Sequence, residues 1–410
     1  PPLKHGAVLI NNSKILAIGP AKDITAPEGA AVEILDFSSK TIMPGMVDCH
    51  TPHNGFGDGR AGDDLATLPD EVLTLQSTRN ARTSLFTGVT TIRENGPKNM
   101  TMFRLRDAVQ QGLVEGPRMI LCGRPISIIG GHMDYFGSAV TGPVEGRAMV
   151  RQLVKEGADY IKITATGGST RTSFPLLPSF NLDELMAIVD EAHKFGILTA
   201  THCTSTLGIE NSLDSGVDMI IHCIFKEPDG QFQFREDIAD RLAESGTFVN
   251  PTLHVLRSKI WSTLYKQEIR RLSVSEQTQL EKDSKDFETA IKHCQKLIER
   301  GVNVITGSDS SWGNYQLGNT VYETECLLMA GMPSMDGIKS ITSKAAKSLG
   351  IDSYVGSLEP GKEADIISVQ GNPITNIDVL WNVQDVISGG HIIDRGSEEV
   401  TKATRQPRPA

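Results

Sequence analysis

Four side chains that can bind a metal ion stand at the ends of apolar runs spread along the chain. The runs are Asp159-Tyr-Ile-Lys-Ile163, Thr199-Ala-Thr-His202, Asp218-Met-Ile-Ile-His222 and Val304-Ile-Thr-Gly-Ser-Asp309. Upstream, Gly45-Met-Val-Asp-Cys-His-Thr-Pro-His53 adds two histidines. A lysine, histidines and an aspartate in these positions supply most of what a hydrolytic metal centre needs.

Lys162 is the most diagnostic of these residues. Burial penalises a protonated lysine and pushes the amine toward neutrality, and a neutral amine can add carbon dioxide to form an anionic carbamate. The carbamate offers two oxygens that can bridge metal ions. The alternative is a rim lysine that extends to solvent or pairs with an acid, which we would prefer for an isolated lysine. The accompanying histidines favour the metal-binding interpretation.

His202 and His222 end successive predicted strands, with room between them for one short β/α unit. Neutral imidazole is a common ligand for zinc and similar cations, although a single histidine is more often a core residue. Asp309 ends the last run and can bind metal or accept the proton of an activated water. Its alternative role is to cap the next helix.

Eight apolar runs alternate with helical patterns between residues 44 and 353. The runs are Met46–His50, Val89–Glu94, Met119–Cys122, Tyr160–Thr164, Ile197–His202, Met219–His222, Phe248–Leu253 and Val302–Ser308. The clearest helices are Leu182–Phe195, which starts with a capping-box pattern, and Ser275–Arg300. This order predicts an α/β fold, a (β/α)8 TIM barrel whose strand ends converge on one mouth. An open doubly wound sheet is the alternative.

Both ends of the chain carry short strand patterns. Ala7–Ile10 and Ile15–Ile18 flank a turn, and Ala364–Val369 and Val386–Ile393 have the same character. We predict that residues 1–43 and 354–400 together form one small β-sandwich domain. Residues 401–410 contain two prolines and little apolar surface, so we expect a flexible tail.

Composition narrows the functional classes. The chain has 410 residues, a formal net charge of −10 and 39% hydrophobic residues, with no Lys/Arg cluster that would follow phosphates. We therefore expect no nucleic-acid partner. No apolar stretch approaches the roughly 20 residues that span a bilayer, and the amino end lacks the apolar core of a signal peptide. These features predict a cytoplasmic protein without a membrane partner.

Six cysteines show no CxxC pairing, which favours buried free thiols in a reducing compartment. Cys49, Cys203 and Cys223 each adjoin a candidate ligand histidine. Neighbours along a strand point to opposite faces, so we predict that these thiols pack in the barrel wall and bind no metal.

Taken together, these residues resemble the metal-dependent amidohydrolase superfamily, in the branch of imidazolonepropionase-like enzymes, Xaa-Pro dipeptidases and ochratoxin-type amidases. The resemblance covers nearly the whole chain. It rests on Pro44-Gly-Met-Val-Asp48, Gly88-Val-Thr-Thr-Ile-Arg93, Gly116-Pro-Arg118, Gly130-Gly-His132, Ile161-Lys-Ile163 with Gly167-Gly168, His202, His222, Asp309 and Leu358-Glu-Pro-Gly-Lys-Glu-Ala-Asp365. Each motif alone is weak, and the ordered combination is strong.

The resemblance implies a ligand set. In relatives, two metals share the carboxylated lysine, which matches Lys162. One metal also takes paired histidines of the first strand and the eighth-strand aspartate, matched here by His50 and Asp309. The other takes the histidines that match His202 and His222. A further histidine, matching His132, lies near the substrate in relatives; the alternative for His132 is a structural loop residue.

Pro52 departs from this pattern, because it stands where relatives have the second histidine of the first strand. His53 can replace that ligand only if a bulge or a turn follows His50, since the two would face opposite sides of a regular strand. Without His53, only the set with His202 and His222 is complete, and a mononuclear centre is expected.

The sequence therefore predicts a metal-dependent hydrolase of an amide-like carbon–nitrogen bond, with one or two zinc ions and carbon dioxide bound as the lysine carbamate. Asp309 would accept a proton from water and return it to the leaving nitrogen. The substrate would be a small molecule: a dipeptide, an N-acyl amino acid, or a compact amide, carbamate or urea. Two alternatives are a cyclic C–N hydrolase or deaminase, and a non-catalytic barrel used for binding. We also expect a homo-oligomer.

Overall fold

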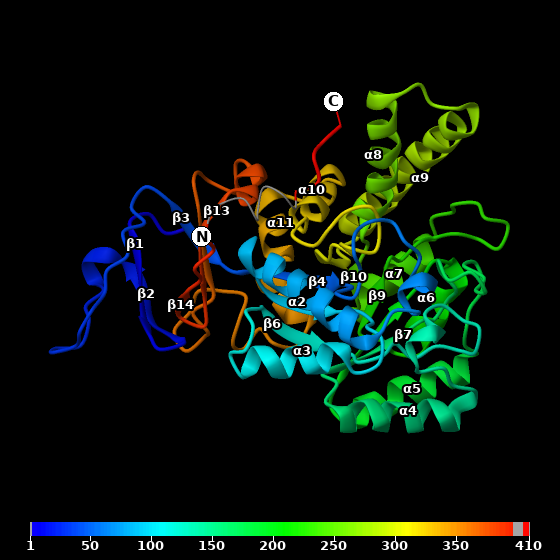
Figure 1. Cartoon of the computed structure of the whole chain (residues 1–410), viewed down its shortest axis with the longest axis horizontal. Coiled ribbons are helices and arrows are strands. Elements are labelled where there is room, and N and C mark those ends of the chain that lie inside the picture. The colour runs from blue at the N-terminus through cyan, green and yellow to red at the C-terminus, as the bar shows by residue number, and fades with distance from the viewer. Residues whose placement is uncertain (1, 397–404, 410) are drawn as a thin grey trace.

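Eight short parallel strands surround the centre of the molecule (Figure 1). The computed structural model describes residues 2–396 and 405–409. Three strands pair in the order β4-β5-β6 and five in the order β11-β10-β9-β8-β7. Their bounds are β4 Met46–Thr51, β5 Val89–Glu94, β6 Arg118–Leu121, β7 Tyr160–Ile163, β8 Leu198–His202, β9 Met219–Ile221, β10 Phe248–Asn250 and β11 Asn303–Val304.

Backbone hydrogen bonds join these two groups of strands on both sides. Between β6 and β7, the Asp159 N–H donates to Leu121 O (2.7 Å) and the Ile126 N–H to Lys162 O (2.9 Å). At the other seam, the Asp309 N–H donates to His50 O (2.8 Å). The eight strands form the predicted TIM barrel, and the open sheet is excluded.

The last two barrel strands are shorter than the sequence predicts. β10 ends at Asn250 because Thr252 has a φ of 49° and helix α8 begins at Leu253. After β11 the chain makes isolated backbone hydrogen bonds to the adjacent strands, such as Ile305 N–H to Val249 O (3.0 Å). At Asp309 the backbone becomes left-handed, with a φ of 49°. Left-handed backbone at Thr252 thus ends the regular pairing of β10, whereas β11 ends at Val304, before the left-handed residue Asp309 is reached.

Helices cover the outside of the barrel. They are α1 Gly62–Leu65, α2 Asp70–Phe86, α3 Thr101–Gln110, α4 Gly142–Glu156, α5 Leu182–Lys194, α6 Thr206–Asp214, α7 Glu236–Ser245, α8 Leu253–Ile269, α9 Val274–Glu299, α10 Val321–Met329, α11 Ser334–Ser340 and α12 Ser343–Ser348. The capping box predicted for α5 is present, formed by Asn181 and Glu184. Fully buried Leu153, Ile188 and Leu242 belong to the core that packs these helices on the strands. Each such side chain contributes about 1.5–3 kcal/mol.

Strands from both termini build two sheets beside the barrel. β1 (Gly6–Asn11) and β2 (Lys14–Pro20) form a hairpin. A second, antiparallel sheet has the order β14-β13-β12-β3. Its strands are β3 Thr41–Pro44, β12 Ile366–Val369, β13 Val383–Ser388 and β14 His391–Ile392. The Ile15 N–H donates to Lys362 O (2.9 Å), so the two terminal segments contact each other directly.

Part of the segment 401–410, for which a flexible tail is predicted, contacts the barrel. Residues 401–404 and 410 lie outside the described residues, but Gln406 is 7% exposed against the barrel. Its N–H donates to Asn319 Oδ1 (2.8 Å), and the Tyr322 hydroxyl donates to its carbonyl (2.6 Å). Arg408 donates to Glu325 (2.7 Å). Backbone groups of Gln406 and the side chain of Arg408 thus hydrogen-bond to the barrel.

All six cysteines are free and buried. Over residues 2–396 and 405–409, none of the helices has the length and apolar character to cross a membrane.

Candidate metal centre

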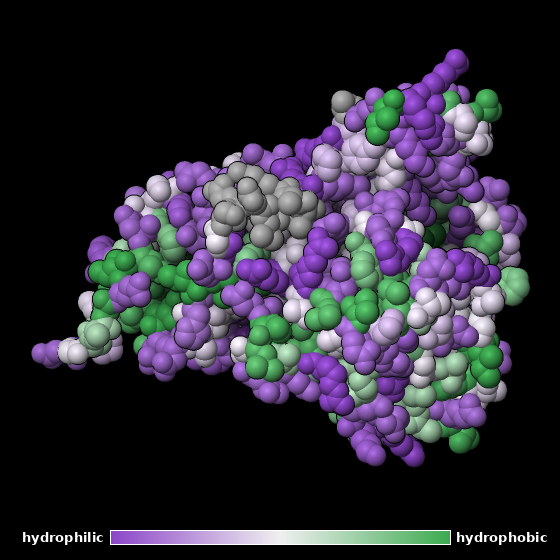
Figure 2. Space-filling view, viewed as in Figure 1, coloured by the Kyte–Doolittle hydropathy of each residue, from purple (hydrophilic) through white to green (hydrophobic). Residues whose placement is uncertain are grey.

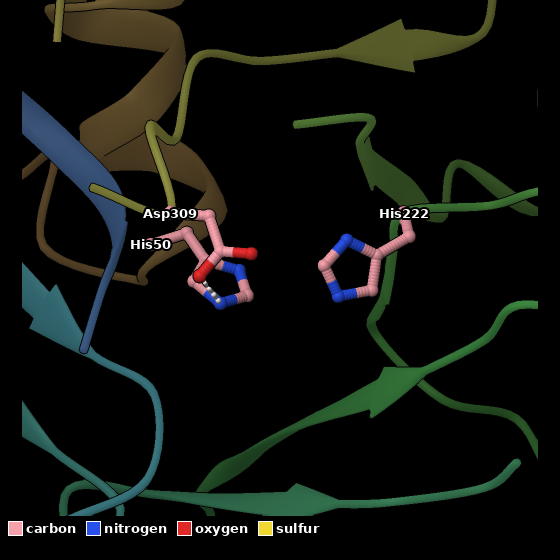
Figure 3. A group of neighbouring side chains, drawn as sticks. All are labelled: His50, His222 and Asp309. Atoms are coloured by element: carbon pink, nitrogen blue, oxygen red, sulfur yellow. Dashed lines mark ion pairs between the residues drawn. The ribbon is translucent and has the colours of Figure 1, made fainter. Parts of the chain in front are cut away.

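His50, His222 and Asp309 come together at the mouth of the barrel. One ligand atom from each lies within 4.8 Å of the others. His50 lies on β4, His222 follows β9, and Asp309 follows β11. Figure 3 shows His222 across from the other two, with all three side chains facing a common space. His50 Nε2 lies 3.3 Å from Asp309 Oδ1.

Two further histidines continue this group. The His202 ring centroid lies 4.6 Å from that of His222 and 4.5 Å from that of His132. His202 Nε2 lies 3.2 Å from the carbonyl oxygen of Gly167. Four histidines thus form a row in the order His50, His222, His202 and His132. His50 and His222 belong to the compact group with Asp309.

Lys162 lies on β7 and is only 2% exposed. Among the described residues its ammonium group has no hydrogen bond or ion pair. Burial, together with the positive charge of Arg93, lowers the pKa of Lys162 to about 7. The negative charge of Asp309 opposes this shift, but the loss of hydration outweighs it and favours loss of the proton.

The structure keeps His53 apart from the compact group. A register shift does occur between Asp48 and Thr51 in the β4–β5 pairing, as a bulge requires. The chain then turns, with the Gly55 N–H donating to Pro52 O (3.1 Å). His53 is fully buried, and its Nδ1 lies 3.4 Å from Thr51 O. The turn therefore forms without bringing His53 beside His50, His222 and Asp309.

Burial also sets the charge of the other groups. It lowers the pKa of His50, His202 and His222 well below the usual value, so these imidazoles are neutral near pH 7. It raises the pKa of Asp309 to about 6, against the opposing charges of His222 and Lys162. Neutral imidazole and carboxylate are the forms that bind a divalent cation.

Unpaired buried atoms test whether this set fits a metal. His50 Nδ1 has no hydrogen-bond partner among the described residues, and the same holds for His53 Nε2. A buried polar atom without a partner costs about 1–3 kcal/mol. Two imidazoles and a carboxylate, with a free ring nitrogen, match the donor types that zinc prefers. The residues therefore fit a divalent cation.

A residue that the sequence analysis missed holds the two sides of the group together. Asp48 is fully buried; its Oδ1 accepts the N–H groups of His50 (3.0 Å) and Ser308 (2.9 Å), and its Oδ2 accepts the Thr320 hydroxyl (2.6 Å). These bonds join β4 to the loop that carries Asp309. The available signal was an aspartate two residues before His50, on the same face of the strand.

Two other missed residues support the group. The Tyr315 hydroxyl lies 2.9 Å from Ser308 O and 3.2 Å from Asp309 O, at the point where Asp309 adopts its left-handed backbone. Thr252 Oγ1 lies 2.6 Å from His222 Nδ1. This contact fixes the orientation of the imidazole and directs its Nε2 as the free ligand atom. No spacing in the sequence links either residue to the centre.

Comparison with known proteins gives matches along the whole chain. Residues 41–393 match the sequence model of the Amidohydrolase family. The chain is 25% identical over 429 residues to an ochratoxinase from Aspergillus niger, which covers 95% of this chain and 83% of that enzyme. It is 23% identical to an imidazolonepropionase from Geobacillus kaustophilus, over 95% of this chain and 90% of that one.

Solved structures match in the same way. A Xaa-Pro dipeptidase with bound methionine in its active site superposes with a TM-score of 0.80 at 29% identity, over 95% of each chain. Molinate hydrolase, at 21% identity, superposes with a TM-score of 0.78 over 98% of this chain and 93% of its own. The second likeness concerns the fold alone.

Removing the Asp48 carboxylate should destabilise the mouth of the barrel. Asp48→Ala leaves three buried donors without an acceptor, so we expect the free energy of unfolding in urea to fall by about 3 kcal/mol or more. Asp48→Asn keeps one acceptor oxygen for the two N–H groups and should lose less than half as much. Equal stability of the alanine variant and the wild type would show that the carboxylate does not join the strands.

Proposed function

The chain belongs to the amidohydrolase family and is a hydrolase of carbon–nitrogen bonds, and from this premise we propose that it cleaves a compact amide with the help of a divalent metal. The observation that carries the proposal is the convergence of His50, His222 and Asp309 at the mouth of the barrel. Strand ends that meet at this face are where TIM-barrel enzymes keep their active sites.

We propose that Lys162, as a carbamate, is shared by two ligand sets. One set comprises His50 and Asp309, and the other His202 and His222. Zinc suits this mixture of imidazole and carboxylate donors. The burial of Lys162 supports the carbamate, because an amine with a pKa near 7 is partly neutral at physiological pH.

A bound divalent cation supplies Lewis acidity, which acidifies water and polarises a carbonyl group. Asp309 accepts the proton of the attacking water and donates it to the leaving nitrogen. Before a cation binds, burial raises the pKa of Asp309 to about 6. A carboxyl group in such a site can accept and return a proton. The Asp48 and Tyr315 contacts orient Asp309 for this transfer.

We propose that His132 contacts the substrate. Its Nδ1 lies 3.0 Å from the Thr170 hydroxyl, which also accepts the Met133 N–H (3.0 Å). The loop thus holds the imidazole in one orientation beside His202. Burial lowers the pKa of His132 to about 3, so this residue meets the substrate as a neutral hydrogen-bonding group.

Dipeptides, N-acyl amino acids and compact amides, carbamates or ureas are the proposed substrates. The likeness to an Aspergillus niger ochratoxinase and a Xaa-Pro dipeptidase supports this range. The likeness to an imidazolonepropionase favours a cyclic carbon–nitrogen compound as the second candidate. Product analysis of the zinc-loaded protein with N-acetyl amino acids, dipeptides and ring amides separates the two; hydrolysis of ring substrates alone would overturn the first.

We also propose that the protein resides in a reducing cytoplasm and forms a homo-oligomer. Six free buried thiols support the compartment. Apolar surface supports the assembly: Figure 2 shows a hydrophobic area over β1 and β2. Leu16 is 45% exposed on β2, and the segment after the hairpin exposes Val32 (51%) and Ile34 (85%). Apolar patches of this kind mark association sites.

Lys162→Ala should lose metal and activity together, because the shared ligand is removed. We expect metal content, measured by mass spectrometry of the purified protein, and kcat/KM each to fall at least about tenfold. A short carboxylic acid such as propionate should restore part of both. Lys155→Ala, an exposed change on α4, is the control. If the Lys162→Ala protein retained full activity and its full metal content, the carbamate proposal would be wrong.

Metal stoichiometry tests the role of Pro52. With His53 outside the compact group, the purified protein should hold about one metal per chain. Pro52→His supplies a second imidazole just after β4, two residues beyond His50, and should raise the occupancy toward about two. If the wild type already holds two ions and His53→Ala loses one, His53 is a ligand and the mononuclear proposal is wrong.

Metal uptake should rise with pH. Asp309 is ionised only above its pKa of about 6, and the Lys162 amine is neutral only above its pKa of about 7. Below these values protons occupy both ligands. We expect the zinc affinity of the metal-free protein, measured by chelator competition, to rise about tenfold or more between about pH 5.5 and about pH 7.5. A flat profile would exclude both groups as ligands.

A further inference from the structure

An apolar cavity lies beside the metal-binding group, where the ends of β9 and β10 meet α8 and α9. Its volume is about 60 Å³. The lining includes Phe225, Phe232, Leu253, Leu256, Leu297 and Ala290. The polar or titratable side chains in the lining are those of His222, Thr252 and His293 and the thiols of Cys223 and Cys294, whose pKa values burial raises. Asp, Glu, Lys and Arg are absent from the lining among the described residues.

His222 connects the cavity with the proposed reaction. The same histidine lines the cavity and belongs to the compact group with His50 and Asp309. Thr252, whose hydroxyl contacts His222 Nδ1 (2.6 Å), also lines the cavity. A molecule held beside His222 therefore has an apolar recess within reach of one of its substituents.

The chemistry of the lining excludes charged substituents. His293 lies among aromatic rings, with centroids 5.2 Å from Phe234 and 5.9 Å from Phe225, and burial lowers its pKa to about 4. A carboxylate or an ammonium group entering this recess would lose its hydration without gaining a partner. An apolar group gains about 0.8 kcal/mol for each buried methylene.

The volume of the cavity limits the size of the substituent that it can hold. A single water needs roughly 10–15 Å³ of such volume, so 60 Å³ holds a group of about four heavy atoms. A branched aliphatic side chain, isobutyl or isopropyl, matches this size, whereas an indole does not.

We propose that this cavity is the specificity pocket of the enzyme and that it binds an uncharged branched aliphatic group of the substrate. The inference rests on the proposed amide hydrolysis and adds the substrate class: amides that carry a leucine-like or valine-like substituent next to the scissile bond.

Two matched substrate pairs test the pocket. N-acetyl-leucine against N-acetyl-glycine varies the amine half, and N-isovaleryl-glycine against N-acetyl-glycine varies the acyl half. For at least one pair we expect kcat/KM of the zinc-loaded enzyme to be about 10- to 100-fold higher for the branched member. Equal values in both pairs would overturn the pocket, while hydrolysis of N-acetyl-glycine would still support the proposed function.

Substitutions in the cavity test whether it causes the preference for the branched substrate. Ala290→Phe fills the recess from α9 and should abolish the preference for the branched member. Leu256→Ala enlarges the recess and should shift the preference toward N-acetyl-phenylalanine or N-phenylacetyl-glycine. Glu288→Phe adds the same ring at an exposed position of α9 and should retain the wild-type ratio. Retention of the preference in both pocket variants would place the specificity elsewhere.

Binding without turnover separates the two proposals. Isovaleramide, an uncharged probe, should give saturation-transfer NMR signals with the wild-type chain and with Glu288→Phe, and none with Ala290→Phe. If no amide is hydrolysed but the probe binds in this pattern, the pocket stands and the catalytic proposal fails. If the probe binds all three proteins alike, or none of them, the pocket assignment is wrong.

Discussion

The contact between the first and last strands of the barrel is the constraint on which the site depends. Asp48 accepts backbone N–H groups from both sides of this seam, joining positions 260 residues apart in the chain. A buried carboxylate is costly unless its oxygens are hydrogen-bonded, and here each oxygen has a donor. Because the seam is closed at this level, His50 and Asp309 must face each other at the mouth.

Burial then determines the chemistry of that mouth. The same loss of hydration lowers the pKa of His50, His222 and Lys162 and raises that of Asp309. The nitrogen atoms of these side chains are therefore neutral and surround one carboxyl group. Such a set binds a metal cation more readily than it takes up another proton. The Arg93 Nε–H donates a hydrogen bond to Cys49 O (2.9 Å). The positive charge of Arg93 favours a neutral amine or a carbamate at Lys162.

Local patterns predicted the elements well because each apolar run, cap and turn acts within a few residues. Helix α5 and strand β5 have nearly the predicted bounds. The end of β10 was misjudged because left-handed Thr252 and the start of α8 cut the strand short, and periodicity does not report backbone angles. β11 also ended earlier than predicted, at Val304, although the apolar run continues. The bond from Ser308 to Asp48 and the contact of Gln406 with Asn319 escaped prediction for another reason: these partners lie far apart in the chain, where spacing carries no information.

Pro52 shows how the departure from the family pattern is built into the structure. Its carbonyl accepts the Ser311 hydroxyl (2.5 Å) and the Gly55 N–H, so the turn after β4 also holds the loop that follows Asp309. A regular strand continuing through residue 52 would direct this carbonyl into strand pairing and give up both contacts. The turn that begins at Pro52 thus supports the loop after Asp309 directly. His50 therefore lies beside a loop that the turn at Pro52 helps to hold, while His202 lies against His222, with ring centroids 4.6 Å apart.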